Sequence, residues 1–443
     1  MTVLKQYRIS ASSAAELVSA IEEGVTRGQL QPGARLPSIR RLASDVGLSP
    51  VTVSAALAEL RRRGVVITEQ RRGTRIGERP PIGSLRAPLP VPPGARDLSR
   101  GNPDPTLLPD LARALQRAQL PVRLYGEPPV LPALASFAAG QLSADGLDGE
   151  HICVVGGALD GIERVLQAHL RAGDRVAVEN PGYAALYDLL RAQGLALEPV
   201  AVDDRGMVPA GLGAALAAGA SAVVITPRGQ NPTGAALDRE RARELRGVLA
   251  KYPHALVIED DHLWSVAGSE LLTLSGGRER WAATRSVAKA LGPDLRLAVL
   301  SADERTIARV QGRQQCGPGW ISHILQSLVL ELWRDADVAA LLARAALLYA
   351  ARRERLLTEL ARRGVRAHGI SGLNVWVPVP EEAAVIGAML QRGWVLAPGA
   401  PYRLAGAPPA VRVTTATLAD EESARLAEDL AAVLAPDGAA RSG

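Results

Sequence analysis

Apolar residues near the start of the chain recur with a helical spacing three times before two short β-branched runs appear. The spacing predicts helices over 12–27, 37–46 and 49–64. The third stretch begins with Ser49 and Pro50, a capping side chain followed by proline at the first helical position. The β-branched runs flank a glycine-containing turn and predict a two-stranded hairpin over 65–76. Three helices followed by a hairpin are the elements of a winged helix-turn-helix.

The pattern changes twice after this hairpin. Residues 78–95 contain six prolines and no periodic apolar spacing, which is typical of a semi-extended tether. Further on, short β-branched runs alternate with helical stretches rich in Ala, Leu and Arg; the runs are 152–155, 175–179, 222–226, 255–259 and 297–301. This alternation predicts a mostly parallel sheet that binds ligands at the carboxyl ends of its strands. We therefore predict a winged helix-turn-helix domain, a Pro-rich linker and an α/β domain, over 1–78, 79–96 and 97–443.

Charge distinguishes the two predicted domains. The first 78 residues hold 12 Lys and Arg against 7 Asp and Glu, whereas the rest of the chain holds 39 of each. All the excess positive charge of the chain thus lies in the first domain, which indicates an anionic partner for that domain, most simply double-stranded DNA. A small helical dimerisation module is the alternative for this segment.

Composition excludes several classes of protein. The chain is 47% apolar and 22% charged, as in globular proteins. Cys153 and Cys316 are isolated, and no His or Cys has metal-ligand spacing, so neither a disulfide framework nor a metal site is expected. Residues 207–227 lack charge, but their Gly and Pro content favours a helix and a buried strand over a membrane span. With no signal peptide visible, a cytoplasmic protein without membrane association is expected.

The first domain resembles the GntR family of bacterial transcription regulators, in particular over LPSIRRLASDVGLSPVTVSAALAELRRRGVV. The resemblance implies that five residues meet DNA: Arg40, Ser49, Thr52 and the wing residues Arg72 and Gly73. The family usually has an arginine just after the capping serine, where this chain has Pro50. That departure leaves the base preference open but not the binding of DNA. The run of arginines at 61–63 also fits a solvated helix end.

Chemically distinctive residues follow the predicted strands of the large domain. Gly156 and Gly157 open a helix whose free N–H groups can hold a phosphate, although a simple tight turn would have the same sequence. Tyr183 could lie flat on a pyridine ring, and Asn231, in PRGQNPTG, could donate a hydrogen bond to a ring hydroxyl. Asp260 could pair with a pyridinium nitrogen and keep it protonated, or could be an ordinary acidic strand end.

Lys289 is one of only three lysines in a chain whose positive charge is almost all arginine. A lysine can lose its proton and attack a carbonyl, which an arginine cannot do. Ser286 precedes it by three residues and Arg296 follows it by seven, so a hydroxyl and a guanidinium are available for the phosphate of a phosphorylated aldehyde. This stretch alone equally fits a surface lysine in a basic loop.

The order of these residues resembles the fold type I aminotransferases, over nearly all of 97–435. The resemblance implies pyridoxal 5'-phosphate as cofactor and Lys289 as the catalytic lysine that forms an imine with it. The other implied cofactor contacts are Asp260, Asn231, Tyr183, Gly157, Ala158, Leu159, Ser286 and Arg296. Tyr125 matches a tyrosine that usually reaches the phosphate from the partner subunit, which implies a homodimer. Arg412 matches the arginine that binds a substrate carboxylate.

His262 departs from the aminotransferase pattern. A tyrosine usually stands two residues after the aspartate, where its hydroxyl meets the ring oxygen of the cofactor. An imidazole can donate a hydrogen bond there too, so His262 is expected to contact the cofactor and to tune it differently. A packed strand-end histidine is the alternative.

Both domains together resemble the MocR branch of the GntR family, regulators that use an aminotransferase-like site as a sensor. The segments LSRGNPDPTLLPD, EDDH, RSVAKALGPDLRL and GLNVWVPV look like those of members linked to vitamin B6 salvage. We therefore predict a DNA-binding regulator that senses pyridoxal phosphate, or an amino compound, through the imine at Lys289. The alternative is a working aminotransferase that also binds DNA. A sensor needs a coupling of about 1–3 kcal/mol, whereas an enzyme must lower its barrier by about 8 kcal/mol or more. His262 suits the first task better, which favours the regulator.

Overall fold

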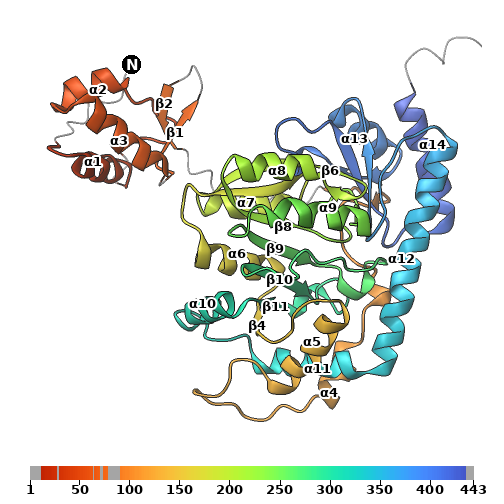
Figure 1. The fold of residues 1–443 in the computed structure, drawn as a ribbon. Helices are drawn as coiled ribbons and strands as arrows, with labels where there is room; N and C mark the ends of the chain where they lie inside the picture. The colour runs from red at the N-terminus through yellow and green to blue at the C-terminus, as the bar shows by residue number, and fades with distance from the viewer. Residues whose placement is uncertain (1–10, 27–28, 63, 70–72, 78–89, 436–443) are drawn as a thin grey trace, which may run out of the picture. The chain divides into compact units, whose positions relative to one another are not determined.

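The structure is a computed structural model that describes residues 11–435 except 27–28, 63, 70–72 and 78–89. The chain divides into two compact units; the first contains the N-terminal residues and the second most of the rest (Figure 1). The Pro-rich linker expected at 79–96 falls largely outside the described residues.

The N-terminal unit contains the three helices and the hairpin that the sequence predicts. Its elements are α1 (Ala14–Thr26), α2 (Ile39–Val46), α3 (Pro50–Arg62), β1 (Val66–Glu69) and β2 (Gly73–Ile76), and the two strands pair antiparallel. The Ser38 hydroxyl accepts the Arg41 N–H at 3.3 Å and caps α2, which ends at Gly47 with φ of 73°. One apolar core, which includes Leu17, Leu42, Leu57 and Ile76, lies entirely within residues 11–76.

The large unit is built on an eight-stranded sheet with the order β4-β11-β10-β9-β8-β5-β6-β7. Its strands are β4 (Ile152–Val155), β5 (Arg175–Asn180), β6 (Ala196–Asp203), β7 (Gly206–Met207), β8 (Ala220–Ile225), β9 (Leu256–Asp261), β10 (Trp281–Ser286) and β11 (Ala298–Ala302). Strands β8, β9 and β10 run parallel, whereas β11 runs antiparallel to both of its neighbours. Every residue of β9 and β10 is buried, as in central strands of α/β sheets. The prediction of a mostly parallel sheet is confirmed.

Eleven helices are described in this unit. They are α4 (Leu111–Arg117), α5 (Pro132–Ala144), α6 (Ala158–His169), α7 (Ala184–Ala192), α8 (Pro209–Ala217), α9 (Arg239–Ala250), α10 (Glu304–Gln315), α11 (His323–Arg334), α12 (Ala336–Arg362), α13 (Glu382–Gln391) and α14 (Asp420–Leu434). The long α12 packs along α14, and α6 packs against α10 (Figure 1).

A small C-terminal sheet brings the two ends of the large unit together. Strands β12 (Asn374–Pro378), β15 (Ala410–Thr414) and β14 (Ala397–Pro398) form it in that order. Nearby, β13 (Trp394–Val395) pairs in parallel with β3 (Arg96–Asp97). The Gly101 N–H then donates to the Thr414 hydroxyl at 3.0 Å, so the segment that follows β3 lies against β15.

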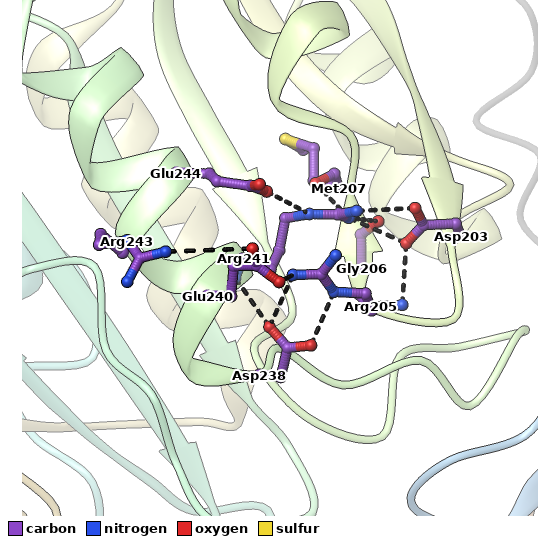
Figure 2. Close-up of polar contacts among 9 residues, drawn as sticks. All are labelled: Asp203, Arg205, Gly206, Met207, Asp238, Glu240, Arg241, Arg243 and Glu244. Atoms are coloured by element: carbon purple, nitrogen blue, oxygen red, sulfur yellow. Dashed lines mark hydrogen bonds and ion pairs between the residues drawn. The ribbon is translucent and has the colours of Figure 1, made fainter.

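An ion-pair network fixes the β6–β7 hairpin to the start of α9 (Figure 2). The buried Arg241 guanidinium donates to both carboxylate oxygens of Asp203, at 2.9 and 2.8 Å, and to the carbonyls of Gly206 and Met207. Arg205 donates to the α9 capping residue Asp238 at 2.7 and 3.0 Å. The bidentate geometry gives this edge of the sheet one defined arrangement.

Candidate functional site

A cavity of about 340 Å³ opens in the large unit where the carboxyl ends of the strands meet. Eleven of the twelve residues proposed from sequence to serve the cofactor or its effector line this cavity: Gly157, Ala158, Leu159, Tyr183, Asn231, Asp260, His262, Ser286, Lys289, Arg296 and Arg412. They come from positions more than 250 residues apart in sequence, and the sheet brings them together at one edge.

Lys289 follows β10 and faces the cavity with its amine. Its Nζ donates a hydrogen bond to the Gly101 carbonyl at 2.7 Å. Burial, together with the positive charge of Arg412, lowers the pKa of Lys289 to about 8. The amine therefore loses its proton far more readily than an ordinary surface lysine, which is what a lysine that attacks a carbonyl requires.

Asp260, next to last in β9, is a buried carboxyl group with few hydrogen-bond donors. Burial and the neighbouring charge of Asp261 raise the pKa of Asp260 to about 7, and Thr284, 3.5 Å away, opposes that shift. Asp261 behaves differently: although burial raises its pKa, hydrogen bonds from Arg228 and the charge of Arg285 bring it below the usual value. Arg228 donates to both oxygens of Asp261 at 2.8 Å. The negative charge of Asp261 is thus balanced by arginines of the protein, whereas the carboxyl group of Asp260 has no such arginine partner among the described residues and is available to a ligand.

His262 lies beside Asp260, with its Nδ1 3.8 Å from the nearer carboxylate oxygen. Burial and the charge of Lys289 lower the pKa of His262 to about 4, so the imidazole is neutral at physiological pH. Within the described part of the chain, the buried Nδ1 has no hydrogen-bond partner. A ring that lines the cavity with an unpaired nitrogen fits a ligand contact better than a packed strand-end residue.

The other end of the cavity has the features of an anion cradle. Helix α6 begins at Ala158, and its free N–H groups favour negative charge. Gly157 has φ of 120°, and a Cβ there would lie 3.3 Å from Nη2 of Arg296. That same nitrogen donates to the Gly156 carbonyl at 3.2 Å, which holds the guanidinium over the helix start.

Arg412, on β15 of the small C-terminal sheet, also lines the cavity. Its Nη1 donates to the Asn231 amide oxygen at 2.9 Å, and its Nη2 donates to the Ser99 carbonyl. Its guanidinium carbon is 4.8 Å from the centre of the Tyr402 ring. Among the described residues, Nε of Arg412 is buried without a hydrogen-bond partner. The Arg412 guanidinium is thus held in one orientation, but it still has an N–H group free to donate a hydrogen bond within the described structure.

Several residues of this cavity were missed by reasoning from sequence. They are Ser99, Gly101, Thr226, Asn374 and Tyr402. The LSRG segment carries a family likeness in the sequence, but backbone carbonyls that contact side chains give no signal there. Tyr402 could have been suspected from its place shortly before Arg412.

Tyr125 does not join the cavity of its own chain. Its side chain is 93% exposed, and its ring meets Trp320 edge to face at 5.5 Å between centroids. The role expected for it across a dimer stays a prediction.

The residues expected to meet DNA that the structure describes are exposed or half-buried in the N-terminal unit. Arg40, Ser49 and Gly73 are exposed and Thr52 is half-buried, while Arg72 lies outside the described residues. The hydroxyls of Ser49 and Thr52 are 2.8 Å apart, and Ser49 accepts the Thr52 N–H at 3.1 Å. Val51, which the sequence reasoning passed over, is 79% exposed in the first turn of α3.

Arg61 fits the alternative of a solvated helix end, because its exposed side chain donates back to the Leu57 carbonyl at 3.2 Å. None of the described helices combines the length and the apolar character that crossing a membrane requires.

Comparisons with known proteins match the two units separately and together. Residues 13–76 match the family model for bacterial regulatory proteins of the gntR family, and residues 95–430 match that for aminotransferase class I and II. The vitamin B6 salvage pathway transcriptional repressor PtsJ of Salmonella typhimurium is 38% identical over 95% of this chain and 98% of its own length.

Two solved structures have the fold of the large unit. An archaeal alanine:glyoxylate aminotransferase superposes with a TM-score of 0.70 at 23% identity, over 77% of this chain and 90% of that one. The α-aminoadipate aminotransferase LysN of Thermus thermophilus, complexed with N-(5'-phosphopyridoxyl)-L-leucine, superposes with a TM-score of 0.68 at 23% identity, over 77% and 92%. The chain therefore belongs to the MocR type of GntR-family transcription regulators, in which a GntR helix-turn-helix is fused to an aminotransferase class I domain.

Proposed function

We propose that the large domain binds pyridoxal 5'-phosphate and that its occupancy, alone or with an amino compound, controls how the winged helix binds operator DNA. The observation that carries this proposal is the cavity itself, in which an amine of lowered pKa, a buried carboxyl of raised pKa and an anion cradle converge. When bound, the cofactor supplies an aldehyde that captures amines and a ring that accepts electrons.

The residues present fit this cofactor. Within the part of the chain that the structure describes, Nδ1 of His262 and Nε of Arg412 have no hydrogen-bond partner, and a Cβ at Gly157 would lie 3.3 Å from Arg296. We assign Lys289 to hold the cofactor through Nζ, Asp260 to pair with its ring nitrogen, and Tyr183 to stack on its ring. Asn231 and His262 are assigned to the ring oxygen. We assign the binding of the phosphate to Ser286, Arg296 and the backbone of Gly157, Ala158 and Leu159.

Arg412 is the group proposed to recognise an effector. A planar guanidinium whose Nε lacks a partner can bind a carboxylate with two parallel hydrogen bonds. An amino acid would use this contact, whereas pyridoxal phosphate acting alone would not need it. Because a relative is named as a vitamin B6 salvage repressor, we propose pyridoxal phosphate as the signal and vitamin B6 salvage as the process controlled.

The partners follow from the same proposal. The winged helix, over residues 1–78, contacts DNA through Arg40, Ser49, Thr52, Arg72 and Gly73. A linker over 79–96 joins it to a sensor domain over 97–443. Two such chains form a homodimer in which Tyr125 of each reaches the cofactor phosphate of the other, so that two winged helices face two half-sites.

The test is operator binding titrated with pyridoxal phosphate and then with a panel of amino acids. DNA from upstream of the gene serves as the probe, and gel shift or fluorescence anisotropy gives the affinity. We expect one ligand to change the affinity by about 5–150-fold, the range of typical coupling free energies. The same titration with Lys289→Ala is the control and should show no ligand effect. An affinity unchanged by every ligand would refute the sensor role.

A second candidate function is aminotransfer itself. It is favoured by the arrangement in one cavity of Lys289, Asp260 and Arg412, which serve the amine, the ring and a substrate carboxylate. Against it stands the neutral imidazole of His262 where a phenol is usual. Amino-group transfer from common amino acids, followed with the purified protein, separates the two. Steady turnover at ordinary enzymatic rates would favour the enzyme.

A further inference from the structure

A second cavity in the large unit is lined mostly by cationic and imidazole side chains. It has a volume of about 370 Å³, and its lining consists of His169, His254, Glu279, Arg280, Asp303, Arg305 and Arg309. These residues stand at the end of α6, before β9 and β10, and at the start of α10. They therefore lie at the amino ends of β9 and β10, opposite the ends that carry Asp260 and Ser286. Six-residue strands separate the two cavities by roughly 20 Å.

A chain of hydrogen bonds orients two of the arginines. Asp303 accepts the Thr306 hydroxyl at 2.6 Å, and that hydroxyl lies 2.8 Å from Nε2 of His169. Since the Thr306 proton points to Asp303, His169 donates from Nε2 and accepts at Nδ1. Arg280 and Arg309 both approach that Nδ1, at 3.3 and 3.4 Å. One neutral imidazole thus holds two guanidiniums side by side.

The protonation of His169 agrees with this arrangement. Burial, together with the charges of Arg280 and Arg309, lowers its pKa to about 4. The ring therefore stays neutral and cannot lose its acceptor role near neutral pH. Backbone carbonyls complete the support: Arg280 donates to the His254 carbonyl at 2.6 Å and Arg309 to the Ala168 carbonyl at 3.3 Å.

The positive charge gathered here is not balanced by ion pairs. No described carboxylate lies within ion-pair distance of Arg280, Arg305 or Arg309, although the described surface elsewhere is rich in such pairs. Asp303 already accepts the N–H groups of Thr306 and Trp281 besides the Thr306 hydroxyl. Glu279 and Asp303 in the lining offset the three guanidiniums only in part, and the remaining repulsion among like charges costs free energy that an anion would recover.

We infer that this cavity is a binding site for a phosphate-type oxyanion, separate from the cofactor cavity. Arg280 and Arg309 present preoriented N–H groups, and Arg305, one helical turn from Arg309 on the same face of α10, adds a third guanidinium with no hydrogen bond of its own within the described structure. Guanidinium forks match the tetrahedral oxygens of phosphate and of phosphate monoesters. Glu279, at the rim, opposes binding and limits the affinity.

The experiment titrates inorganic phosphate into the full-length chain by calorimetry at about pH 7.5, where phosphate is mostly dianionic, with chloride at matched ionic strength as the blank. Arg305→Gln should weaken phosphate binding by about tenfold or more, because charge-assisted hydrogen bonds are lost. It breaks no described contact, so the fold should persist. Glu279→Gln should strengthen binding about two- to fivefold by removing a like charge. Arg243→Gln, an exposed arginine paired with Glu240 at 4.0 Å (Figure 2), should change nothing.

The cofactor cavity could also take up phosphate, so each titration is repeated with Arg296→Gln. The loss caused by Arg305→Gln should remain in that background. Equal affinities for Arg305→Gln and the unaltered chain, or weaker binding by Glu279→Gln, would overturn the inference. A parallel arm replaces phosphate with a duplex of unrelated sequence. If Arg305→Gln weakens duplex binding but leaves the phosphate titration unchanged, the site is not one for a small oxyanion.

Discussion

Two features of the chain lower the pKa of the Lys289 amine. Burial favours its neutral form, and the guanidinium of Arg412 adds electrostatic repulsion to the charged form. The Gly101 carbonyl, 2.7 Å away, accepts a hydrogen bond from either form. The result is a pKa of about 8, so roughly a tenth of the molecules carry the neutral amine at pH 7.

The rate at which the chain captures pyridoxal phosphate should therefore depend on pH. Only the neutral amine attacks, so the rate constant should rise about tenfold from pH 7 and level off above pH 8 to 9. Arg412→Gln removes one cause of the lowered pKa and should move this rise to higher pH. Stopped-flow absorbance measures both profiles. A rate independent of pH between 6 and 9 would contradict the assignment.

Replacement of Lys289 gives a second prediction at this scale. Lys289→Ala should abolish the visible absorbance that develops when the unaltered chain takes up pyridoxal phosphate, because Lys289 is the one lysine among the described residues that lines this cavity. The N-terminal unit, which has its own core, should still fold. Lys251→Ala removes an exposed lysine and is the matched control, with a spectrum like that of the unaltered chain. If the Lys289→Ala spectrum is unchanged, Lys289 does not hold the cofactor.

At the level of elements, α3 differs from the usual recognition helix in its first turn. Pro50 stands where the family usually has arginine, and the helix has no basic side chain before Arg61. The most exposed apolar side chain in this turn is Val51, at 79%. Recognition helices place their N-terminal residues against base edges in the major groove. A valine there can contact the methyl group of thymine but cannot donate to guanine.

We therefore predict that Val51 reads a thymine methyl in each half-site. Replacing that thymine with uracil removes only the methyl and should weaken binding about fourfold, as expected for one buried methyl group. Val51→Ala should weaken binding to the thymine operator and lose the difference between thymine and uracil. Leu347→Ala, at a site 73% exposed on α12, is the control. A scan of uracil substitutions that leaves every affinity unchanged would refute the contact.

Many of the elements could be predicted because they carry a local pattern. Ser49-Pro50 marked the start of α3, and the β-branched runs marked β8 and β9. Strand β10, with the sequence WAATRS, carries no such run and was missed. The antiparallel direction of β11 could not be predicted, because nothing local in 298–302 states which way a strand runs in its sheet. The pairing of β3 with β13 joins residues about 300 apart, and it helps to place Ser99 and Gly101 beside Arg412 and Lys289. The reactive side chains at the strand ends could be identified from the sequence. The backbone carbonyls that accept their hydrogen bonds could not.

At the scale of the whole molecule, each unit buries its own apolar surface. Among the described residues, one core lies wholly within 11–76, and three more lie within the large unit. Each of these described cores stabilises its own unit by burial of apolar surface. The proposed coupling between cofactor and operator is therefore not expected to act through a shared apolar core.

Removal of residues 1–78 should leave the sensor intact and abolish operator binding. The truncated chain should take up pyridoxal phosphate with unchanged visible absorbance, because every residue that lines the cofactor cavity lies between 99 and 412. Spectrophotometric titration and gel shift with the same preparation measure both properties. A truncated chain that still shifts the operator would show that the DNA-contact assignment is wrong.

The isolated N-terminal fragment, residues 1–78, tests whether base recognition and operator affinity depend on different parts of the chain. Residues 1–78 alone should fold, since their core is self-contained, and should keep the preference for thymine over uracil that Val51 confers. Their operator affinity should nevertheless fall by about 10²–10⁴, because without the large domain two winged helices no longer bind as one dimer. Fluorescence anisotropy on one half-site and on two half-sites distinguishes the cases: the fragment should bind both probes with similar affinity, whereas the full chain should prefer two. If the full chain shows no such preference, the large domains do not pair the winged helices on DNA, and coupling between cofactor and operator must act within a single chain.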